Sequence, residues 1–268
     1  MFGDFVNNSP AGVWQFATVT ICGATLHLLR FVWNQHIMHI GILKTDAVRP
    51  EWASQFGEYP DMFQRLFLAV DATLSFTVWD VECGELPDDA SCVDGYVITG
   101  SKSSVYDDKA WIRQAETFIR ELHAQRRKVV GICFGHQLIA RALGGVVDKS
   151  TNGWGVGVHE YELLHSPEQG RDQLSLIASH QDQVMGLPPG AEIIASNSHC
   201  PIAGFRMGDH ILTFQGHPEF IPEYAREIIG FRRQMIGDAR ADEGLETLSS
   251  RTQEGPWVAR WILDFLRA

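Results

Sequence analysis

The stretch that most constrains the fold is residues 129–143, with the sequence VVGICFGHQLIARAL. Its apolar start predicts a β-strand, and its end predicts a helix. The Gly-x-Cys-x-Gly pattern between them predicts a sharp strand-to-helix turn that raises the side chain of Cys133 above a sheet. Glycines suit the flanks because a Cβ there would crowd the approach of a substrate to sulfur, and a helix N-terminus favours a thiolate. By itself the pattern is equally compatible with a structural cysteine in a glycine-rich turn.

From residue 38 onward, strand-like and helix-like segments alternate. Strands are expected at residues 40–43, 74–79, 96–99 and 129–132, and helices at 61–69 and along the face formed by Trp111, Ala115, Phe118, Ile119 and Leu122. This alternation predicts an α/β fold in which a mostly parallel sheet is flanked by helices. Ligands of such sheets bind beyond the carboxyl ends of the strands, where we expect both Cys133 and the turn at Gly100 and Ser101.

The second half of the chain has a different pattern. Short strand-like pieces at residues 156–164, 191–195 and 211–214 are separated by glycine and proline turns, which predicts a small antiparallel strand set. Two closing helices are expected at residues 224–235 and 257–266, each preceded closely by a proline. The charged segment 237–255 between them is predicted to be a solvated loop.

Residues 1–37 do not resemble the rest of the chain, and we expect them to form an extension outside the domain of residues 38–268. The segment 11–33 is long enough to span a membrane, but polar residues such as Gln15, His27 and Arg30 interrupt it. A secretory signal is disfavoured because the first charged residue is Asp4. A membrane anchor therefore remains the less favoured alternative.

Charge and cysteine usage exclude several function classes. With 33 acidic and 22 basic residues the net charge is −11, which argues against nucleic-acid binding. The five cysteines are dispersed, without a pair or a metal-like spacing, so we expect reduced thiols in a cytoplasmic protein and no metal site. The cysteines other than Cys133 are predicted to be buried or half-buried small hydrophobic residues. They are Cys22, Cys83, Cys92 and Cys200.

A thiol nucleophile needs a base and a group that orients the base. The segment 215–220, QGHPEF, follows a predicted strand and precedes a predicted helix. Because Pro218 restricts the backbone between them, His217 and Glu219 can point toward the same site. These residues predict a triad in which Glu219 orients His217 and His217 activates Cys133.

Three motifs together resemble those of class I, triad-type glutamine amidotransferases. They are GICFGHQ at residues 131–137, SHQDQV at 179–184 and GHPE at 216–219, and they occur in the order and at about the spacing of that family. Within the family, the chain resembles GMP-synthase-type amidotransferase domains and the free-standing plant γ-glutamyl peptidases. The resemblance implies a flavodoxin-like fold and a reaction without a cofactor.

The resemblance also implies a reaction, namely hydrolysis of a γ-glutamyl amide in glutamine or in a γ-glutamyl peptide or conjugate. Cys133 would attack the side-chain carbonyl to form a γ-glutamyl thioester, and His217 would protonate the leaving group. Backbone N–H groups of Phe134 and of the Gly100–Ser101 turn would hold the oxyanion. Gln137 matches the position that contacts the glutamyl group of the substrate.

Other polar residues in or near these motifs have less defined roles. His136 is interpreted as a packing residue at a helix start rather than a second base. His180 and Asp182 are interpreted as part of the architecture of the site or, alternatively, as a capped turn. Ser101 stands where many members of the family have a second glycine. Free-standing γ-glutamyl peptidases resemble this chain in having a Gly-Ser turn there, so the serine weakens the case for strict glutamine specificity.

Three other functions stay open at the level of sequence. One is a glutaminase subunit that delivers ammonia to a separate synthase partner, since the chain has no Gly-x-x-x-x-Gly-Lys motif for nucleotide binding of its own. Another is a non-catalytic binding module on the same fold. The third is a cysteine esterase of the α/β-hydrolase type, but that family places its acid before its histidine, whereas Glu219 follows His217 here.

Overall fold

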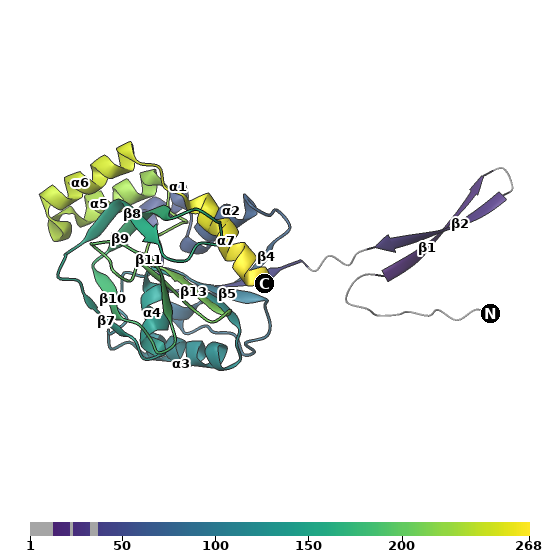
Figure 1. The fold of residues 1–268 in the computed structure, drawn as a ribbon, viewed down its shortest axis with the longest axis horizontal. Coiled ribbons are helices and arrows are strands. Elements are labelled where there is room, and N and C mark those ends of the chain that lie inside the picture. Colours follow the sequence, from purple (N-terminus) through teal and green to yellow (C-terminus); the bar gives the residue numbers. More distant parts are fainter. Residues whose placement is uncertain (1–12, 22–23, 33–36) are drawn as a thin grey trace. The chain divides into compact units, whose positions relative to one another are not determined.

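The computed structural model describes residues 13–21, 24–32 and 37–268 (Figure 1). The chain separates into two compact units, Met1–Ile37 and Met38–Ala268. In the first unit, β1 (Val13–Ile21) and β2 (Ala24–Val32) pair in antiparallel fashion. Among the described residues, no helix has the length and apolar character needed to cross a membrane. Cys22 lies outside the described residues.

A mixed sheet organises the second unit. In the described residues it has nine strands in the order β4-β3-β5-β6-β13-β12-β11-β8-β9. Neighbours from β4 to β13 pair in parallel, and the later neighbours pair antiparallel. The expected α/β fold, with antiparallel strands from the second half of the chain, is confirmed. The strands of this sheet are β3 (His39–Lys44), β4 (Ser75–Asp80), β5 (Gly95–Ile98), β6 (Lys128–Ile132), β8 (Gly155–Leu163), β9 (Gln173–His180), β11 (Glu192–Ser196), β12 (Gly204–Met207) and β13 (Ile211–Phe214).

Helices cover both faces of this sheet. Successive residues of a strand point to opposite faces, so neighbouring residues join different hydrophobic cores. Val97 of β5 joins the core beneath α2 and α7, whereas its neighbours Tyr96 and Ile98 join the core beneath α3 and α4. A third core lies among α1, α5, α6 and strands β8 and β9. The remaining elements are α1 (Pro50–Phe56), α2 (Tyr59–Leu68), η1 (Val81–Cys83), α3 (Ala110–Ala124), α4 (Phe134–Ala142), α5 (Pro222–Ile236), α6 (Asp238–Ser250), α7 (Gly255–Arg267), and the antiparallel pair β7 (Val146–Lys149) and β10 (Asp182–Gly186).

The helix predicted from apolar spacing is α3. All five residues expected on its apolar face are buried, and Tyr96 of β5 packs edge-on against Phe118 at 5.6 Å between ring centroids. The two closing helices are α5 and α7, and each has a proline in its first turn. A three- and four-residue repeat of large apolar side chains therefore sufficed to locate these elements.

The prediction of a solvated loop at residues 237–255 is wrong, because most of this segment forms α6. Its buried side consists of Ala241, Gly244 and Leu248, spaced as on one helix face but too small or too few to stand out among charged neighbours. Gly244 lets α6 lie directly on β8, since a Cβ there would be 2.8 Å from Cγ2 of Val156. The helix appears in Figure 1 beside α5.

The prediction that the cysteines other than Cys133 are buried or half-buried is wrong for two of them. Cys83 and Cys92 are exposed free thiols, whereas Cys200 is buried. Cys83 ends the short turn η1, where its N–H donates to Asp80 at 3.2 Å, and Cys92 lies in the loop before β5. Both belong to connections at the surface, where residue hydrophobicity does not decide exposure.

Gly157 offers a test of the contact between α6 and β8. Its φ is +82°, and a Cβ there would lie 2.5 Å from the carbonyl oxygen of Gly244 and closer still to Thr247. Gly170 has nearly the same φ, +81°, with nothing within 4 Å of the added Cβ. We expect Gly170→Ala to lower the free energy of unfolding by about 1 kcal/mol through backbone strain alone, and Gly157→Ala to lower it by about a further 1–3 kcal/mol.

Urea denaturation of the two variants and the wild type measures this difference. Equal losses for the two alanine variants would contradict the packing of α6 on β8.

Candidate active site

Cys133 occupies a strained turn between β6 and α4. Its φ is +52° and its ψ is −101°, and it is one of two non-glycine residues with positive φ in the part of the chain that the structure describes. Its N–H donates to Phe214 at 2.8 Å, and its carbonyl accepts from Gln137 at 3.1 Å. Such a backbone costs about 1–3 kcal/mol and persists where the surroundings enforce it. The predicted elbow is present, and Cys133 stands at its apex.

The glycines of the elbow serve a different purpose from the one expected. A Cβ on Gly131 would lie 2.6 Å from the carbonyl oxygen of Gly135, and a Cβ on Gly135 would lie 2.5 Å from the carbonyl oxygen of Ile98. The obstacles are backbone atoms of the elbow and of β5. These glycines therefore allow the start of α4 to pack against the sheet.

His217 and Glu219 follow β13 and lie next to the elbow. The His217 N–H donates to Ile177 of β9 at 2.8 Å, and its ring nitrogen Nδ1 lies 2.8 Å from Oε1 of Glu219. The imidazole stacks on Phe220 with ring centroids 3.9 Å apart and planes 9° apart. Both polar side chains are buried. The expected pairing of this histidine with this carboxylate is thus present.

The charge state of His217 follows from its neighbours. Burial by itself lowers the pKa of the imidazole, but the negative charges of Glu219 and Cys133 outweigh burial and raise that pKa to about 10. Because Nδ1 faces the carboxylate, it carries a proton that it donates to Glu219. The other nitrogen, Nε2, is left for the thiol. The charges around the ring therefore favour its protonated, imidazolium form.

The turn at Gly100 and Ser101 lies against this pair. A Cβ on Gly100 would be 2.9 Å from Cε1 of His217 and 3.7 Å from Cβ of Cys133, so glycine is needed for the imidazole to fit. Phe134 is the first residue of α4, and the first N–H groups of a helix have no partner within the helix. The elements expected to supply oxyanion donors therefore border Cys133 on two sides.

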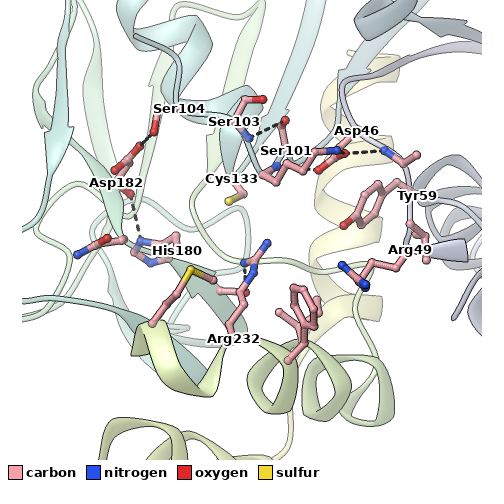
Figure 2. Close-up of a pocket in the computed structure, with 18 of the residues that line it drawn as sticks. Asp46, Arg49, Tyr59, Ser101, Ser103, Ser104, Cys133, His180, Asp182 and Arg232 are labelled. Atoms are coloured by element: carbon pink, nitrogen blue, oxygen red, sulfur yellow. Dashed lines mark hydrogen bonds and ion pairs between the residues drawn. The ribbon is translucent and has the colours of Figure 1, made fainter. Parts of the chain in front are cut away.

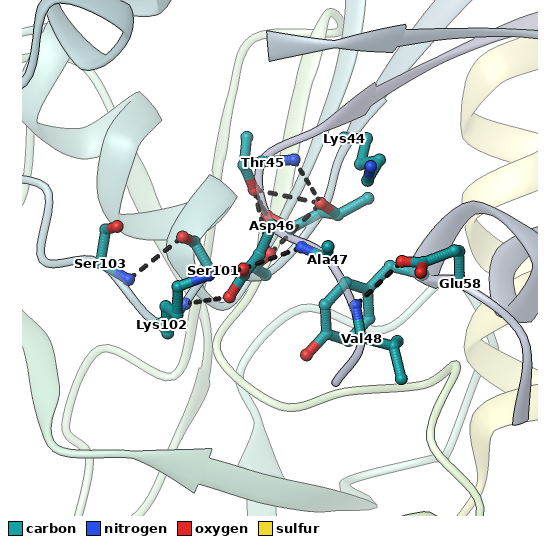
Figure 3. Close-up of polar contacts among 12 residues, drawn as sticks. Lys44, Thr45, Asp46, Ala47, Val48, Glu58, Ser101, Lys102 and Ser103 are labelled. Atoms are coloured by element: carbon teal, nitrogen blue, oxygen red, sulfur yellow. Dashed lines mark hydrogen bonds and ion pairs between the residues drawn. The ribbon is translucent and has the colours of Figure 1, made fainter. Parts of the chain in front are cut away.

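Asp46, which the sequence did not single out, holds this turn in place (Figure 3). Its carboxylate accepts a hydrogen bond from the N–H of Lys102 at 2.7 Å and pairs with the ammonium of the same residue. Thr45 donates to the carbonyl of Gly100 at 3.0 Å, and Ser103 donates its N–H to Oγ of Ser101 at 3.1 Å. Asp46 follows β3, which pairs in parallel with β5, so both segments leave the sheet at the same edge. The strand order that brings them together cannot be read from the sequence.

Cys133 opens into a pocket of about 720 Å³ at the carboxyl ends of the strands (Figure 2). Ser101 and Gln137 also line it. Gln137 is buried, and its Nε2 donates to the carbonyl of Asp182 at 2.8 Å and to Oε1 of Gln215 at 3.0 Å. Its amide nitrogen is therefore committed to the protein.

His180 and Asp182 are wall residues of the same pocket. The carboxylate of Asp182 accepts hydrogen bonds from Ser104 at 2.5 Å and from Tyr106 at 3.0 Å, which ties the segment after β5 to β10. Nδ1 of His180 lies 3.2 Å from the carbonyl of Asp182, and its buried Nε2 has no hydrogen-bond partner in the part of the chain that the structure describes. Burial lowers the pKa of His180 well below its usual value, so the ring is neutral and Nε2 is a hydrogen-bond acceptor.

His136 lies away from this chemistry. It is fully buried, its Nδ1 lies 2.8 Å from Oγ1 of Thr213, and its ring packs against Phe205. Burial lowers its pKa to about 3. These contacts agree with a packing residue.

Much of the pocket wall was not foreseen. The segment after β3 and one face of α5, neither of which the sequence analysis singled out, contribute many of its residues. These residues are Asp46, Ala47, Val48, Arg49, Pro50, Trp52, Tyr224, Ile228, Phe231, Arg232 and Met235. The α5 residues recur every three or four positions, so their common face was readable, but nothing in the sequence placed that face opposite the elbow.

Among the described residues, no group of three or more histidine, cysteine or acidic residues is arranged to hold a metal ion.

The family model of class I glutamine amidotransferases matches residues 59–233. The chain belongs to the class I glutamine amidotransferase family. Gamma-glutamyl peptidase 3 of Arabidopsis thaliana is 33% identical over 229 residues, which are 81% of this chain and 87% of that protein. The glutamine-hydrolyzing GMP synthase of Aromatoleum aromaticum is 31% identical over 185 residues, which are 59% of this chain and 33% of that protein.

The fold of this family member has counterparts among solved structures. A glutamine amidotransferase from Thermotoga maritima superposes with a TM-score of 0.65 at 19% identity, covering 87% of this chain and 97% of its own. At that identity the likeness concerns the fold alone.

The charge of Glu219 can be tested without an assay of activity. Glu219→Gln keeps the shape of the side chain but removes the charge that raises the pKa of His217 from its usual value. We expect that pKa to fall by more than about one pH unit, as measured by NMR titration of the histidine rings. Glu223→Gln, on the exposed first turn of α5, is the control. An unchanged titration of His217 in Glu219→Gln would contradict the assignment.

The same shift links pH to stability. The folded-state pKa of about 10 exceeds the ordinary histidine value of 6.5, so protonation of His217 stabilises the fold fully below pH 6.5. That stabilisation is lost as the pH rises through about 10, because the unfolded chain releases the proton earlier. Between about pH 7 and pH 10, the free energy of unfolding should fall more steeply in the wild type than in Glu219→Gln.

Proposed function

We propose that this protein hydrolyses γ-glutamyl amide bonds of small peptides or conjugates, with Cys133 as nucleophile. The observation that carries the proposal is the strained Cys133 beside the buried His217–Glu219 pair at the base of an open pocket. The similarity to a γ-glutamyl peptidase, at 33% identity over 87% of that protein, supports the choice of bond.

The first chemical step is attack on the γ-carbonyl. The thiolate of Cys133 forms a carbon–sulfur bond, and the carbonyl π electrons move to oxygen. The N–H groups of Phe134 and of the Gly100–Ser101 turn would stabilise this oxyanion, since both elements border the sulfur.

The second step expels the amine. The imidazolium of His217 transfers its Nε2 proton to the amide nitrogen, the carbon–nitrogen bond breaks, and a γ-glutamyl thioester remains on Cys133. Water then attacks the thioester carbonyl while neutral His217 takes a proton from it. The carbon–sulfur bond breaks, glutamate leaves, and the thiolate is restored beside the imidazolium. Glu219 keeps the ring in the required tautomer throughout.

Gln137 is proposed to contact the glutamyl half of the substrate. Its Nε2 already donates to Asp182 and Gln215, which leaves the carbonyl oxygen to accept a hydrogen bond from the substrate's ammonium group. A thiolate enzyme whose other described cysteines are free suits the reducing cytoplasm.

A second candidate is a glutaminase subunit that supplies ammonia to a separate synthase. The similarity to GMP synthase favours it, although the match spans only 33% of that protein. A partner-dependent glutaminase should be nearly inactive alone, whereas a peptidase should turn over in isolation. A non-catalytic module would retain neither activity.

The decisive assay measures glutamate release from glutamine and from γ-glutamyl dipeptides by the purified protein. We expect turnover of γ-glutamyl dipeptides, and a loss of at least about 10³-fold in Cys133→Ala. Cys92→Ala, which removes an exposed thiol, is the control and should retain activity. Activity in Cys133→Ala would remove this residue from the mechanism. Inactivity of the wild type on every donor, with or without cell extract, would refute hydrolysis.

We further propose that residues 38–268 contain the whole catalytic unit and that residues 1–37 are dispensable for it. A chain that begins at Met38 should fold and keep kcat/KM within about twofold of the full chain, because the residues assigned to chemistry all lie in the larger unit. A large loss of kcat/KM in a folded truncated protein would show that the extension takes part in catalysis.

A further inference from the structure

The pocket is larger than the chemistry described above requires. A volume of about 720 Å³ lies in the range that encloses a drug-sized ligand. A γ-glutamyl group is only the size of one amino-acid residue. The wall formed by Trp52, Phe231 and Arg232, here called the amine-side subsite, has no role in the proposed bond cleavage. Trp52 belongs to α1, and the other two residues belong to α5.

The apolar part of this wall is an exposed ring that has two packing neighbours. Phe231 is 54% exposed, which is high for a large aromatic side chain. Trp52 packs edge-on against it at 5.8 Å between centroids, and the Arg49 guanidinium lies 3.9 Å from the centroid of the same ring. An aromatic surface that packs against its neighbours and is also open to a pocket is typical of a ligand-binding wall.

The polar part of the wall is Arg232, whose partner differs from those of the neighbouring cations. Arg49 pairs with Glu51 and Lys102 pairs with Asp46. By contrast, the guanidinium of Arg232 donates to the hydroxyl of Ser179 at 3.2 Å and lies 5.7 Å from the ring centroid of Trp154. Within the described residues, no carboxylate forms an ion pair with it.

The side chain of Arg232 points into the pocket. Figure 2 shows its side chain extending from α5 into the cavity that holds Cys133. A guanidinium binds a carboxylate through two parallel hydrogen bonds, and it does so most strongly where water is partly excluded. An arginine in this place, hydrogen-bonded to a neutral hydroxyl, is arranged to receive a carboxylate from a ligand.

We propose that the amine-side subsite binds the leaving half of the substrate. Arg232 binds a carboxylate on the amine fragment, and Trp52 and Phe231 contact a large apolar side chain on the same fragment. The preferred substrates are then γ-glutamyl amino acids or peptides with an aromatic or long apolar residue after the γ-glutamyl bond. The inference rests on the proposed function and adds specificity to it.

Glutamine would leave this subsite empty, because its leaving group is ammonia. The competing role for Arg232 is to bind the α-carboxylate of the glutamyl half, which every donor shares. The two roles differ in one respect. If Arg232 binds the amine fragment, its replacement weakens the binding only of substrates that carry a carboxylate on that fragment. If it binds the glutamyl half, its replacement weakens the binding of all donors by the same factor.

The test compares γ-glutamylphenylalanine with γ-glutamylphenethylamide, which lacks only the carboxylate of the amine fragment. In the wild type, kcat/KM should favour the former. In Arg232→Met the ratio of the two kcat/KM values should fall by about 10–100-fold, as expected for the loss of a charged hydrogen bond. Arg226→Met removes the same charge from the same helix, at a residue that contacts Leu248 and Ser249 instead of the pocket, and should leave the ratio unchanged.

The apolar contact has its own measurement. Phe231→Ala should lower the preference for γ-glutamylphenylalanine over γ-glutamylglycine by about 3–30-fold, in keeping with the loss of one aromatic contact. A ratio that is unchanged in Arg232→Met, or an equal loss on both phenyl substrates, would overturn the carboxylate assignment. A preserved preference in Phe231→Ala would overturn the apolar one.

Binding separates this inference from the proposed function. Calorimetry with Cys133→Ala should detect both γ-glutamylphenylalanine and γ-glutamylphenethylamide, and adding Arg232→Met should weaken the binding of the former alone by about 10–100-fold. If the wild type cleaves no γ-glutamyl donor but this binding difference is seen, the proposed function fails and the subsite stands. If cleavage occurs and neither ratio nor affinity responds to Arg232→Met, the subsite fails alone.

Discussion

The site depends on the parallel pairing of β6 with β13. In this register Phe214 lies opposite Ile132, so both strands end at the same level, and the N–H of Cys133 donates to the carbonyl of Phe214. Residues that follow two adjacent parallel strands must emerge at one edge of the sheet. The thiol and the His217–Glu219 pair meet for this reason. Gly135 packs closely on Ile98, which keeps the start of α4 against the sheet.

Buried charge at this edge is compensated locally. The imidazolium of His217 has a carboxylate on one side and a thiol on the other, and Asp46 is satisfied by the turn that it orders. Charges removed from water are tolerated only with such partners. Arg232 differs, because its protein partner is neutral. The charged groups near the nucleophile are therefore paired within the protein, whereas Arg232 on α5 can pair with a charge on a ligand.

Two errors of sequence reasoning have a common physical cause. On the buried face of α6, Gly244 lies directly against Val156 and Gly157 of β8, and such a close backbone approach carries no hydrophobic periodicity. The exposure of Cys83 and Cys92 follows from surface connections around β4 and β5. In both cases the decisive neighbour is distant in sequence or is solvent, and neither is encoded in the local pattern.

The sequence by itself determined the α/β order, the elbow at Cys133 and the pairing of His217 with Glu219, because strand and helix periodicity and short-range turn chemistry are local properties. Only the tertiary structure showed which atoms make glycine necessary in the elbow and how Asp46 orders the turn after β5. It also showed which face of α5 lines the pocket with Cys133. Those features join residues from elements far apart in the chain. Their geometry comes from packing, which a linear pattern does not specify.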